Sequence, residues 1–178
     1  MSHPDLHSWV EQGQFTKLIQ QIHSKDDPEP KALACYGLLV RWKNDKAQNQ
    51  EKIWLRFVEG NPCTALTIQY LQWICSKVHR FGKRVLVIFW DHASWHVTTK
   101  VLDWVRTHNR QIKQTGKGVR LLICFLPKKS PWLNAIEPIW IHAKRKIVEP
   151  ERKLSAEEVV SRVCSVFAHP LLPLLRNT

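Results

Sequence analysis

Two acidic residues stand where carboxylates could bind metal ions. Asp91 directly follows the apolar run Val85–Trp90, and Glu137 follows after 45 intervening residues, just before Pro138. Carboxylate oxygens are ligands that Mg²⁺ and Mn²⁺ prefer, and two such ions about 3.5–4 Å apart can activate a nucleophile and stabilise a leaving oxygen. The pair therefore predicts metal-dependent phosphodiester cleavage, with Asp91 and Glu137 as both catalytic residues and metal ligands.

Each acid also has a purely structural interpretation. Asp91 could form a turn or cap a helix. Asn134-Ala-Ile-Glu137 matches a capping box, in which the Glu side chain bonds the N-cap amide. Pro138 weakens that interpretation, because Asn134 as N-cap would put proline where the first helical N–H is needed. If Pro138 instead opens the helix, Glu137 becomes the N-cap, a position that Glu does not favour.

Positive charge is concentrated around Glu137. The chain has 178 residues and a net charge of +12. Residues 100–153 carry 13 Lys and Arg against four Asp and Glu, so this segment holds +9 of the total. Such a field is typical of proteins that bind phosphate backbones, since each neutralised phosphate releases counterions. DNA is therefore the expected partner, and a merely soluble basic face is the alternative.

The composition predicts one globular domain without membrane contact. Hydrophobic residues make up 44% of the chain and include nine Trp, which argues against disorder. No apolar run reaches the roughly 18 residues of a membrane span, and the N-terminus lacks the layout of a signal peptide. We expect a cytoplasmic protein with an extended arm at residues 1–30, rich in turn formers, and a single domain at residues 31–178.

The five Cys are scattered and contain no Cys-x-x-Cys pair. This pattern predicts reduced thiols in the core rather than disulfides. His92 and His96 have the i,i+4 spacing of zinc ligands, but the sequence suggests no third or fourth ligand beside them.

The elements that would position the two acids begin with a hairpin. Apolar runs at 31–42 and 52–59 are rich in β-formers and predict two antiparallel strands. Asn61 as N-cap and Pro62 at the first helical position predict a helix that ends at Gly82.

Buried strands then alternate with helices. The run before Asp91 is apolar on both faces, as expected of a central strand covered by helices on both sides. This order predicts an α/β fold with a mixed sheet flanked by helices, in which functional groups gather at the carboxyl ends of the strands. The predicted elements are strands at 85–90 and 119–126, helices at 98–110, 137–148 and 155–169, and a loop at 111–118.

The acidic segments resemble motifs of the DDE transposases, in particular the mariner-like insertion-sequence branch. WDHASWH at 90–96 resembles the second acidic motif, and LPKKSPWLNAIEPIW at 126–140 with HAKRK at 142–146 resembles the third. The resemblance extends from about His7 to the end of the chain. It implies a ribonuclease H-like fold, Mg²⁺ or Mn²⁺ as cofactor, and cleavage and strand transfer of DNA at insertion-sequence ends.

The resemblance also assigns roles to residues around the two acids. Asn134 matches the loop that presents the third acid. Ser94 and His96 match positions that support the second, although a helix-start Ser and a packed His explain them equally well. His92, next to Asp91, is expected to support that acid too. Basic residues that match or accompany the motif are expected to meet DNA phosphates, with a solvated face as the alternative. They are Lys128, Lys129, Lys144, Arg145 and Lys146.

The sequence departs from the family pattern in three respects. His92 stands where Asn is usual and Ala135 where Pro is common. The 45 residues between the acids exceed the spacing of compact members. The family's first Asp lies on an opening strand before the segment that His7-Ser8-Trp9 resembles. We therefore expect that first strand to be missing, and Asp91 and Glu137, the family's second and third acids, to form an incomplete two-metal site that is inactive alone.

The leading interpretation is thus a catalytic-domain fragment of a transposase. A non-catalytic DNA-binding or regulatory fragment that associates with full-length transposase is the first alternative, and a homo-oligomer is possible. The two remaining alternatives are a decaying transposase remnant with an exposed sheet edge and a standalone nuclease of the same fold class. Transposon ends and target DNA are the expected nucleic-acid partners.

Overall fold

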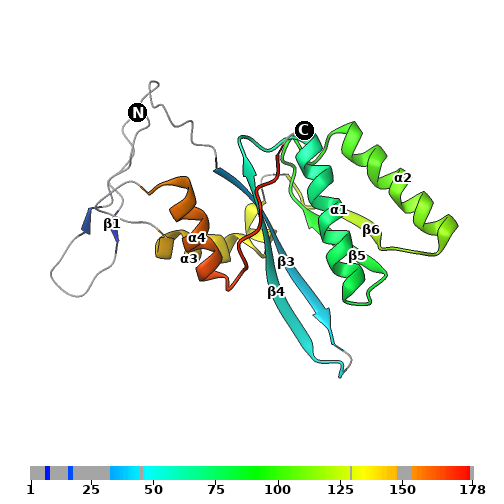
Figure 1. The fold of residues 1–178 in the computed structure, drawn as a ribbon, viewed down its shortest axis with the longest axis horizontal. Coiled ribbons are helices and arrows are strands. Elements are labelled where there is room, and N and C mark those ends of the chain that lie inside the picture. Colours follow the sequence, from blue (N-terminus) through cyan, green and yellow to red (C-terminus); the bar gives the residue numbers. More distant parts are fainter. Residues whose placement is uncertain are drawn as a thin grey trace.

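The computed structural model describes residues 7–8, 16–17, 33–44, 46–128, 130–147 and 154–176. Most of the predicted arm at residues 1–30, and Lys129, lie outside this part. The order of the larger elements, from hairpin through alternating helices and strands to two final helices, is as predicted (Figure 1). The elements are β1 (His7–Ser8), β2 (Thr16–Lys17), β3 (Leu33–Lys43), β4 (Asn49–Glu59), α1 (Thr64–Arg80), β5 (Val85–Trp90), α2 (Thr99–Thr115), β6 (Arg120–Phe125), a 3₁₀ turn (Pro131–Leu133), α3 (Glu137–Ile147) and α4 (Ala156–Val166).

The β3–β4 hairpin lies between two hydrophobic cores. Its strands pair antiparallel from Leu33↔Glu59 to Lys43↔Asn49, which confirms the predicted hairpin. Side chains alternate between the two faces of a strand, so both faces of this hairpin can be buried. In Figure 1, α1 and α2 lie on one side of the hairpin and α3 and α4 on the other. The first core takes Tyr36, Val40, Trp54 and Val58 from the hairpin, and the second takes Leu55 and Phe57.

The predicted single mixed sheet is wrong for the described residues. β3 pairs with β4, and β5 pairs with β6 in parallel register from Val85↔Arg120 to Trp90↔Phe125. Among the described strands no hydrogen-bonded register joins β3 to β5. Apolar periodicity reports which residues are strand-like, but it does not specify the neighbouring strand. β3 and β5 therefore each keep one edge without a strand partner in the described part of the chain.

Burial of β5 on both faces was also predicted, and this is wrong. Ile88 faces the first core and is 4% exposed. The opposite face remains open because the helices of the described chain pack against one face of β5 and β6. Its apolar side chains are Val85, Val87, Phe89 and Leu122, which are 48%, 47%, 69% and 43% exposed.

Helix α1 begins later than predicted. Its N-cap is Cys63, whose backbone is extended at φ −144° and ψ 172°, rather than Asn61. The N–H of Thr67 donates to the carbonyl of Cys63 at 2.9 Å and makes the first helical bond. The fixed φ of Pro62 is compatible with extended backbone as well as with a first helical position, so proline did not set the boundary.

Helices α2 and α4 differ from prediction at their C-terminal ends. α2 continues to Thr115, so most of the loop expected at 111–118 is helical, and the helix ends at Gly116 in the left-handed conformation with φ 66°. α4 has the predicted capping box between Ser155 and Glu158 but ends at Val166, three residues before His169. The extra length between the two acids is therefore held mainly in a helix rather than in a loop.

The C-terminal segment lies against the outer edge of β4. The N–H of Leu175 donates to the carbonyl of Phe57 at 2.8 Å, and Arg56 Nη2 donates to the carbonyl of Pro173 at 3.0 Å. An unpaired strand edge exposes N–H and C=O groups that attract other chains. This contact covers part of the β4 edge and leaves the opposite edge of the hairpin, on β3, without an equivalent cover among the described residues.

All five Cys are free thiols, but the predicted location in the core is wrong for Cys124. Cys75 and Cys164 are buried, whereas Cys124 is exposed on the open face of β6. Burial raises the pKa of the Cys75 thiol to about 12. That thiol is therefore protonated and unreactive near neutral pH.

Candidate metal centre

Asp91 emerges at the carboxyl end of β5, as predicted. The N–H of Leu126 donates to the carbonyl of Trp90 at 2.8 Å, so the backbone ladder continues up to the residue before Asp91. The side chain of Asp91 is 50% exposed. Its Oδ1 accepts the N–H of Ala93 at 3.1 Å, the kind of contact that the turn interpretation predicted. No described residue hydrogen-bonds Oδ2, so this oxygen can bind a cation.

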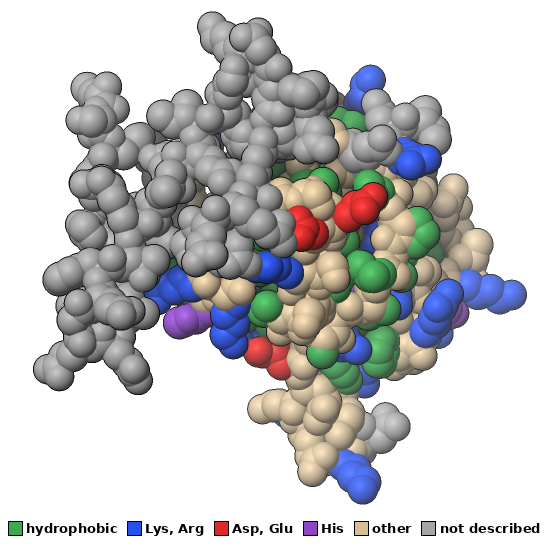
Figure 2. Space-filling view, turned by 60° about the vertical axis from the view of Figure 1, so that its left-hand side comes forward, with side chains coloured by type: hydrophobic (Ala, Val, Ile, Leu, Met, Phe, Trp, Pro, Cys, Tyr) green, Lys and Arg blue, Asp and Glu red, His purple; other side chains and the backbone are tan. Residues whose placement is uncertain are grey.

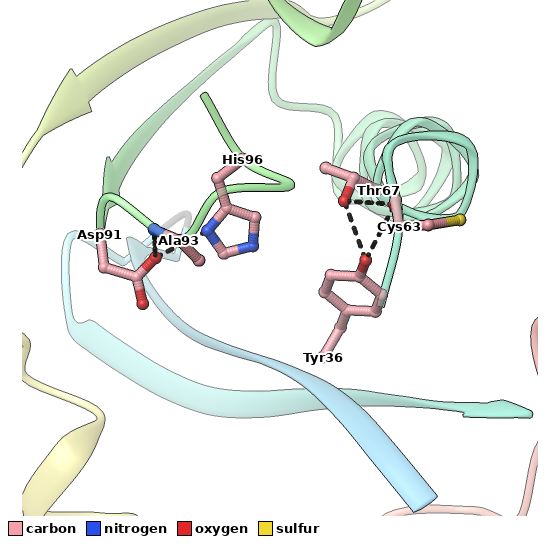
Figure 3. Close-up of polar contacts among 6 residues, drawn as sticks. All are labelled: Tyr36, Cys63, Thr67, Asp91, Ala93 and His96. Atoms are coloured by element: carbon pink, nitrogen blue, oxygen red, sulfur yellow. Dashed lines mark hydrogen bonds and ion pairs between the residues drawn. The ribbon is translucent and has the colours of Figure 1, made fainter. Parts of the chain in front are cut away.

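His96 holds the same oxygen of Asp91. Its Nδ1 lies 2.7 Å from Asp91 Oδ1, and its side chain is 11% exposed (Figure 3). A carboxylate can only accept, so Nδ1 carries the proton in this pair. Aromatic rings surround the imidazole, with centroids at 4.4 Å for Trp90, 5.8 Å for Trp95 and 6.3 Å for Tyr36. His96 is therefore both a packed His and a support for Asp91.

The pKa of Asp91 is lowered by its neighbours. The hydrogen bond from His96 has the largest effect, and the N–H of Ala93 and the charges of His96 and His92 act in the same direction. Partial burial opposes them but is outweighed. Asp91 is consequently ionised at neutral pH, which is the state that binds a metal ion.

Glu137 is the first residue of α3. Its N–H donates to the backbone carbonyl of Asn134 at 3.0 Å. The hydrogen bonds of the described residues include none from the Asn134 N–H to the Glu137 carboxylate, so the predicted alternative of a capping box is wrong. Pro138 occupies the second helical position, where no N–H is needed for the helix. Among the described residues, no hydrogen bond or ion pair engages the carboxylate of Glu137.

Both acids line one cleft of about 690 Å³. His96 and Asn134 also line it, so four of the predicted site residues border the same cleft. His92 does not: it is exposed and stacks on Phe125 with ring centroids 5.2 Å apart. Ser94 is exposed and is not part of the lining either.

The residues that position Glu137 beside the hairpin were not predicted from the sequence. A side-chain carbon added at Gly37 of β3 would lie 2.5 Å from Trp140 Cζ2 and 3.2 Å from Ile136 Cδ1. The missing side chain thus lets the first turn of α3 pack directly on the hairpin. A glycine inside a strand often marks such close approach, and this was the available signal.

The predicted basic residues lie along α3 and before it. Lys144, Arg145 and Lys146 are exposed in the last turn of the helix that begins with Glu137, and Lys128 is exposed after β6. On the face drawn in Figure 2, Lys and Arg side chains lie in several separate places with hydrophobic side chains between them. These three charges therefore lie together at the C-terminal end of a helix whose first residue lines the cleft.

The donor set suits a hard divalent cation but is small. Ionised carboxylate oxygens are ligands that Mg²⁺ and Mn²⁺ accept, and Asp91 and Glu137 supply them. Within the described residues, no group of three or more His, Cys, Asp or Glu could hold a metal ion. A further ligand from outside these residues is needed for a complete protein site.

A protein-family model described as DDE superfamily endonuclease matches residues 46–160, more than half of the chain. The matched segment includes both Asp91 and Glu137. No curated protein and no solved structure matches the chain. None of the described helices is long and apolar enough to cross a membrane.

Replacing His96 by Phe should raise the pKa of Asp91 toward its ordinary value of about 3.9, because Phe fills the aromatic site without donating a hydrogen bond. An Asn at the same position can still donate and should keep the pKa low. The pKa of Asp91 is lower in the folded chain than in the unfolded chain. The interaction with His96 therefore stabilises the fold at pH values above the unfolded pKa, and this contribution is lost as the pH falls through the folded pKa. Carboxyl-carbon NMR titration measures the shift, and equal pKa values in wild type and His96→Phe would contradict the assignment.

Gly37→Ala should lower the free energy of unfolding by about 1–3 kcal/mol, because the added methyl group overlaps Trp140. Urea denaturation measures this effect. Lys43→Ala on the exposed end of the same strand is the control and should change stability by less than about 0.5 kcal/mol. Equal stability of the two variants would mean that Trp140 does not depend on Gly37.

Proposed function

We propose that this chain, which belongs to the DDE superfamily of endonucleases, carries two of the carboxylates of a metal-dependent DNA transposase site. Asp91 and Glu137 are the proposed metal ligands and catalytic residues. Their placement on one cleft, with Asp91 kept ionised by His96, is the observation that carries the proposal.

The proposed reaction is hydrolytic nicking of DNA followed by strand transfer. Mg²⁺ or Mn²⁺ held by the two carboxylates would supply activation of the nucleophile and stabilisation of the leaving oxygen. His96 fixes Oδ1 of Asp91 and leaves Oδ2 to bind the cation. The exposed charges of Lys144, Arg145 and Lys146 bind phosphates and orient the backbone toward the cleft.

We assign the chain to the mariner-like insertion-sequence branch and its fold to the ribonuclease H-like class. The parallel β5–β6 pair, the antiparallel hairpin and the acid at the end of β5 support this assignment. A third carboxylate from a first strand outside the described residues completes the proposed site. Without it, the two acids hold an ion loosely, and the chain alone does not cut DNA at a measurable rate.

A regulatory role is the second candidate. The described residues hold fewer than three possible metal ligands in any one group, while the basic residues of α3 remain exposed. A chain of this kind binds DNA without cutting it and competes with an active transposase for the same sites. Cytoplasmic location and association with another transposase chain belong to this proposal.

Asp91→Asn and Glu137→Gln should each weaken Mn²⁺ binding at least tenfold, because each removes a charged ligand from the cleft. Isothermal titration calorimetry of the purified chain with MnCl₂ measures the affinity. Asp103→Asn is the matched control, since Asp103 pairs with Arg106 at 2.7 Å on the exposed surface of α2. Wild-type affinity in both cleft variants would rule out a metal centre formed by these acids.

Duplex DNA should bind with an affinity that falls as salt rises, because phosphate contacts release counterions. The double variant Lys144→Gln and Arg145→Gln should reduce the slope of log affinity against log salt by about 0.9 for each phosphate that the variant no longer neutralises. Fluorescence anisotropy of a labelled duplex provides the slope. The control is Lys43→Gln and Lys46→Gln near the hairpin tip, and an equal reduction of the slope there would show that α3 does not bind the DNA.

A further inference from the structure

A group of positive charges lies on the α1 side of the hairpin, outside the cleft. Lys52 and Arg56 of β4 are four residues apart, so their side chains leave the same face of the strand, the face that packs on the first core. Trp73 and Lys77 of α1 are about one turn apart and lie on one side of that helix. We call these four residues and the nearby His169 the Trp73 patch. None of the five lines the cleft.

The indole ring of Trp73 holds two of the cations. Arg56 Cζ lies 5.2 Å from the ring centroid, and Lys77 Nζ lies 5.5 Å from it. The ring itself packs against Tyr70 and Trp54 of the first core, with centroids 5.8 Å and 6.3 Å away. A cation over an aromatic face is attracted to it, so both side chains lose freedom before any ligand arrives. The two charges are therefore preorganised to bind an anion.

Arg56 keeps most of its hydrogen-bond donors. Its Nη2 donates to the carbonyl of Pro173 at 3.0 Å, and no other described group accepts an N–H of this guanidinium. A guanidinium has five N–H donors in one plane, which can bind two oxygens of a phosphate at once. The ion pairs between described residues include none with Arg56, Lys52 or Lys77. The charge of the Trp73 patch is thus open to an anion from outside the chain.

His169 lies where the three cations of the Trp73 patch act together. Its Nδ1 donates to the carbonyl of Pro170 at 2.8 Å, and its Nε2 accepts the N–H of Leu55 at 3.3 Å, so the ring is neutral. Burial lowers the pKa of His169 most, and the charges of the two lysines and Arg56 lower it further, against the hydrogen bond to Pro170. Among the described residues, the charges that act on the ring are all positive.

We propose that the Trp73 patch binds the phosphate backbone of duplex DNA at a surface separate from the cleft. Duplex DNA carries one negative charge for about every 1.7 Å of its axis, so several phosphates can meet the three cations together. Membership of an endonuclease family favours nucleic acid over an acidic protein as the partner. The proposal goes beyond the proposed function, because it involves neither of the two acids nor α3.

The Trp73 patch and the basic residues of α3 face different stretches of DNA. α1 packs on one face of the hairpin and α3 on the other (Figure 1). Contacts to phosphates position a duplex without reading its sequence, so binding at the Trp73 patch is indifferent to sequence. Removal of the charges on one surface should leave the contribution of the other unchanged, because distant sites act independently.

Salt-dependent binding of a labelled duplex tests the Trp73 patch. The double variant Lys52→Gln and Lys77→Gln should reduce the slope of log affinity against log salt by about 0.9 for each phosphate that it no longer neutralises. The same reduction is expected when these changes are added to Lys144→Gln and Arg145→Gln. Fluorescence anisotropy measures the slope.

The matched control removes the same charge from α2. Lys100 and Lys113 are exposed on this helix and lie outside the Trp73 patch. Lys100→Gln with Lys113→Gln should leave the slope unchanged, whereas a diffuse basic field would lose as much slope here as at the Trp73 patch. Urea denaturation checks that both double variants are folded.

The pKa of His169 gives a second readout in the unaltered chain. Phosphates on the Trp73 patch offset its positive charges, so saturating duplex at low salt should raise the pKa of His169 by about 0.5 or more. NMR titration of the imidazole protons measures this value. His108 is the control, because its ring stacks on Trp104 and contacts the carbonyl of Val119, and its titration should not change.

Three results would overturn the proposal. They are an unchanged slope in the Lys52 and Lys77 variant, an equal reduction in the α2 control, and an unchanged pKa of His169 with duplex bound. If the slope falls only in the Lys144 and Arg145 variant, the proposed function stands and the Trp73 patch fails. A polyglutamate peptide with the charge of the duplex that raises the pKa of His169 equally overturns DNA as the partner and indicates an acidic protein.

Discussion

Burial of the β3–β4 hairpin on both faces is the constraint on which the rest of the structure depends. One face contributes Tyr36 and Trp54 to the core that holds β5, and the other contributes Leu55 and Phe57 to the core that holds α3. Asp91 follows β5, and Glu137 begins α3. The two acids therefore stand on elements of different cores, and both line one cleft because both cores pack on the same pair of strands.

Much of this arrangement could be predicted from sequence. The apolar run before Asp91 gave a strand and its end, and helical periodicity gave α2 and the later helices. Local sequence signals failed where a contact between residues far apart in the sequence determines the structure. The packing of Trp140 on Gly37 was not predicted. The capping and metal-binding interpretations of Glu137 could not be distinguished until the first residue of the helix was known.

The sheet was the larger error, and its cause is physical. Six apolar residues in a row are compatible with a strand buried on both faces, but they do not show that both covers are present. In the described chain, Val85, Val87 and Phe89 face outward. The apolar pattern therefore indicates which side chains of β5 are able to be buried. The structure shows which of them are buried among the described residues.

His96 links the packing of the first core to the chemistry of Asp91. Its ring is held among Trp90, Trp95 and Tyr36, and Tyr36 is fixed in turn by a 2.8 Å hydrogen bond to Thr67 of α1. Packing of the first core and orientation of the Asp91 carboxylate are thus expected to be coupled, because the side chains that border the cleft also hold His96 in place.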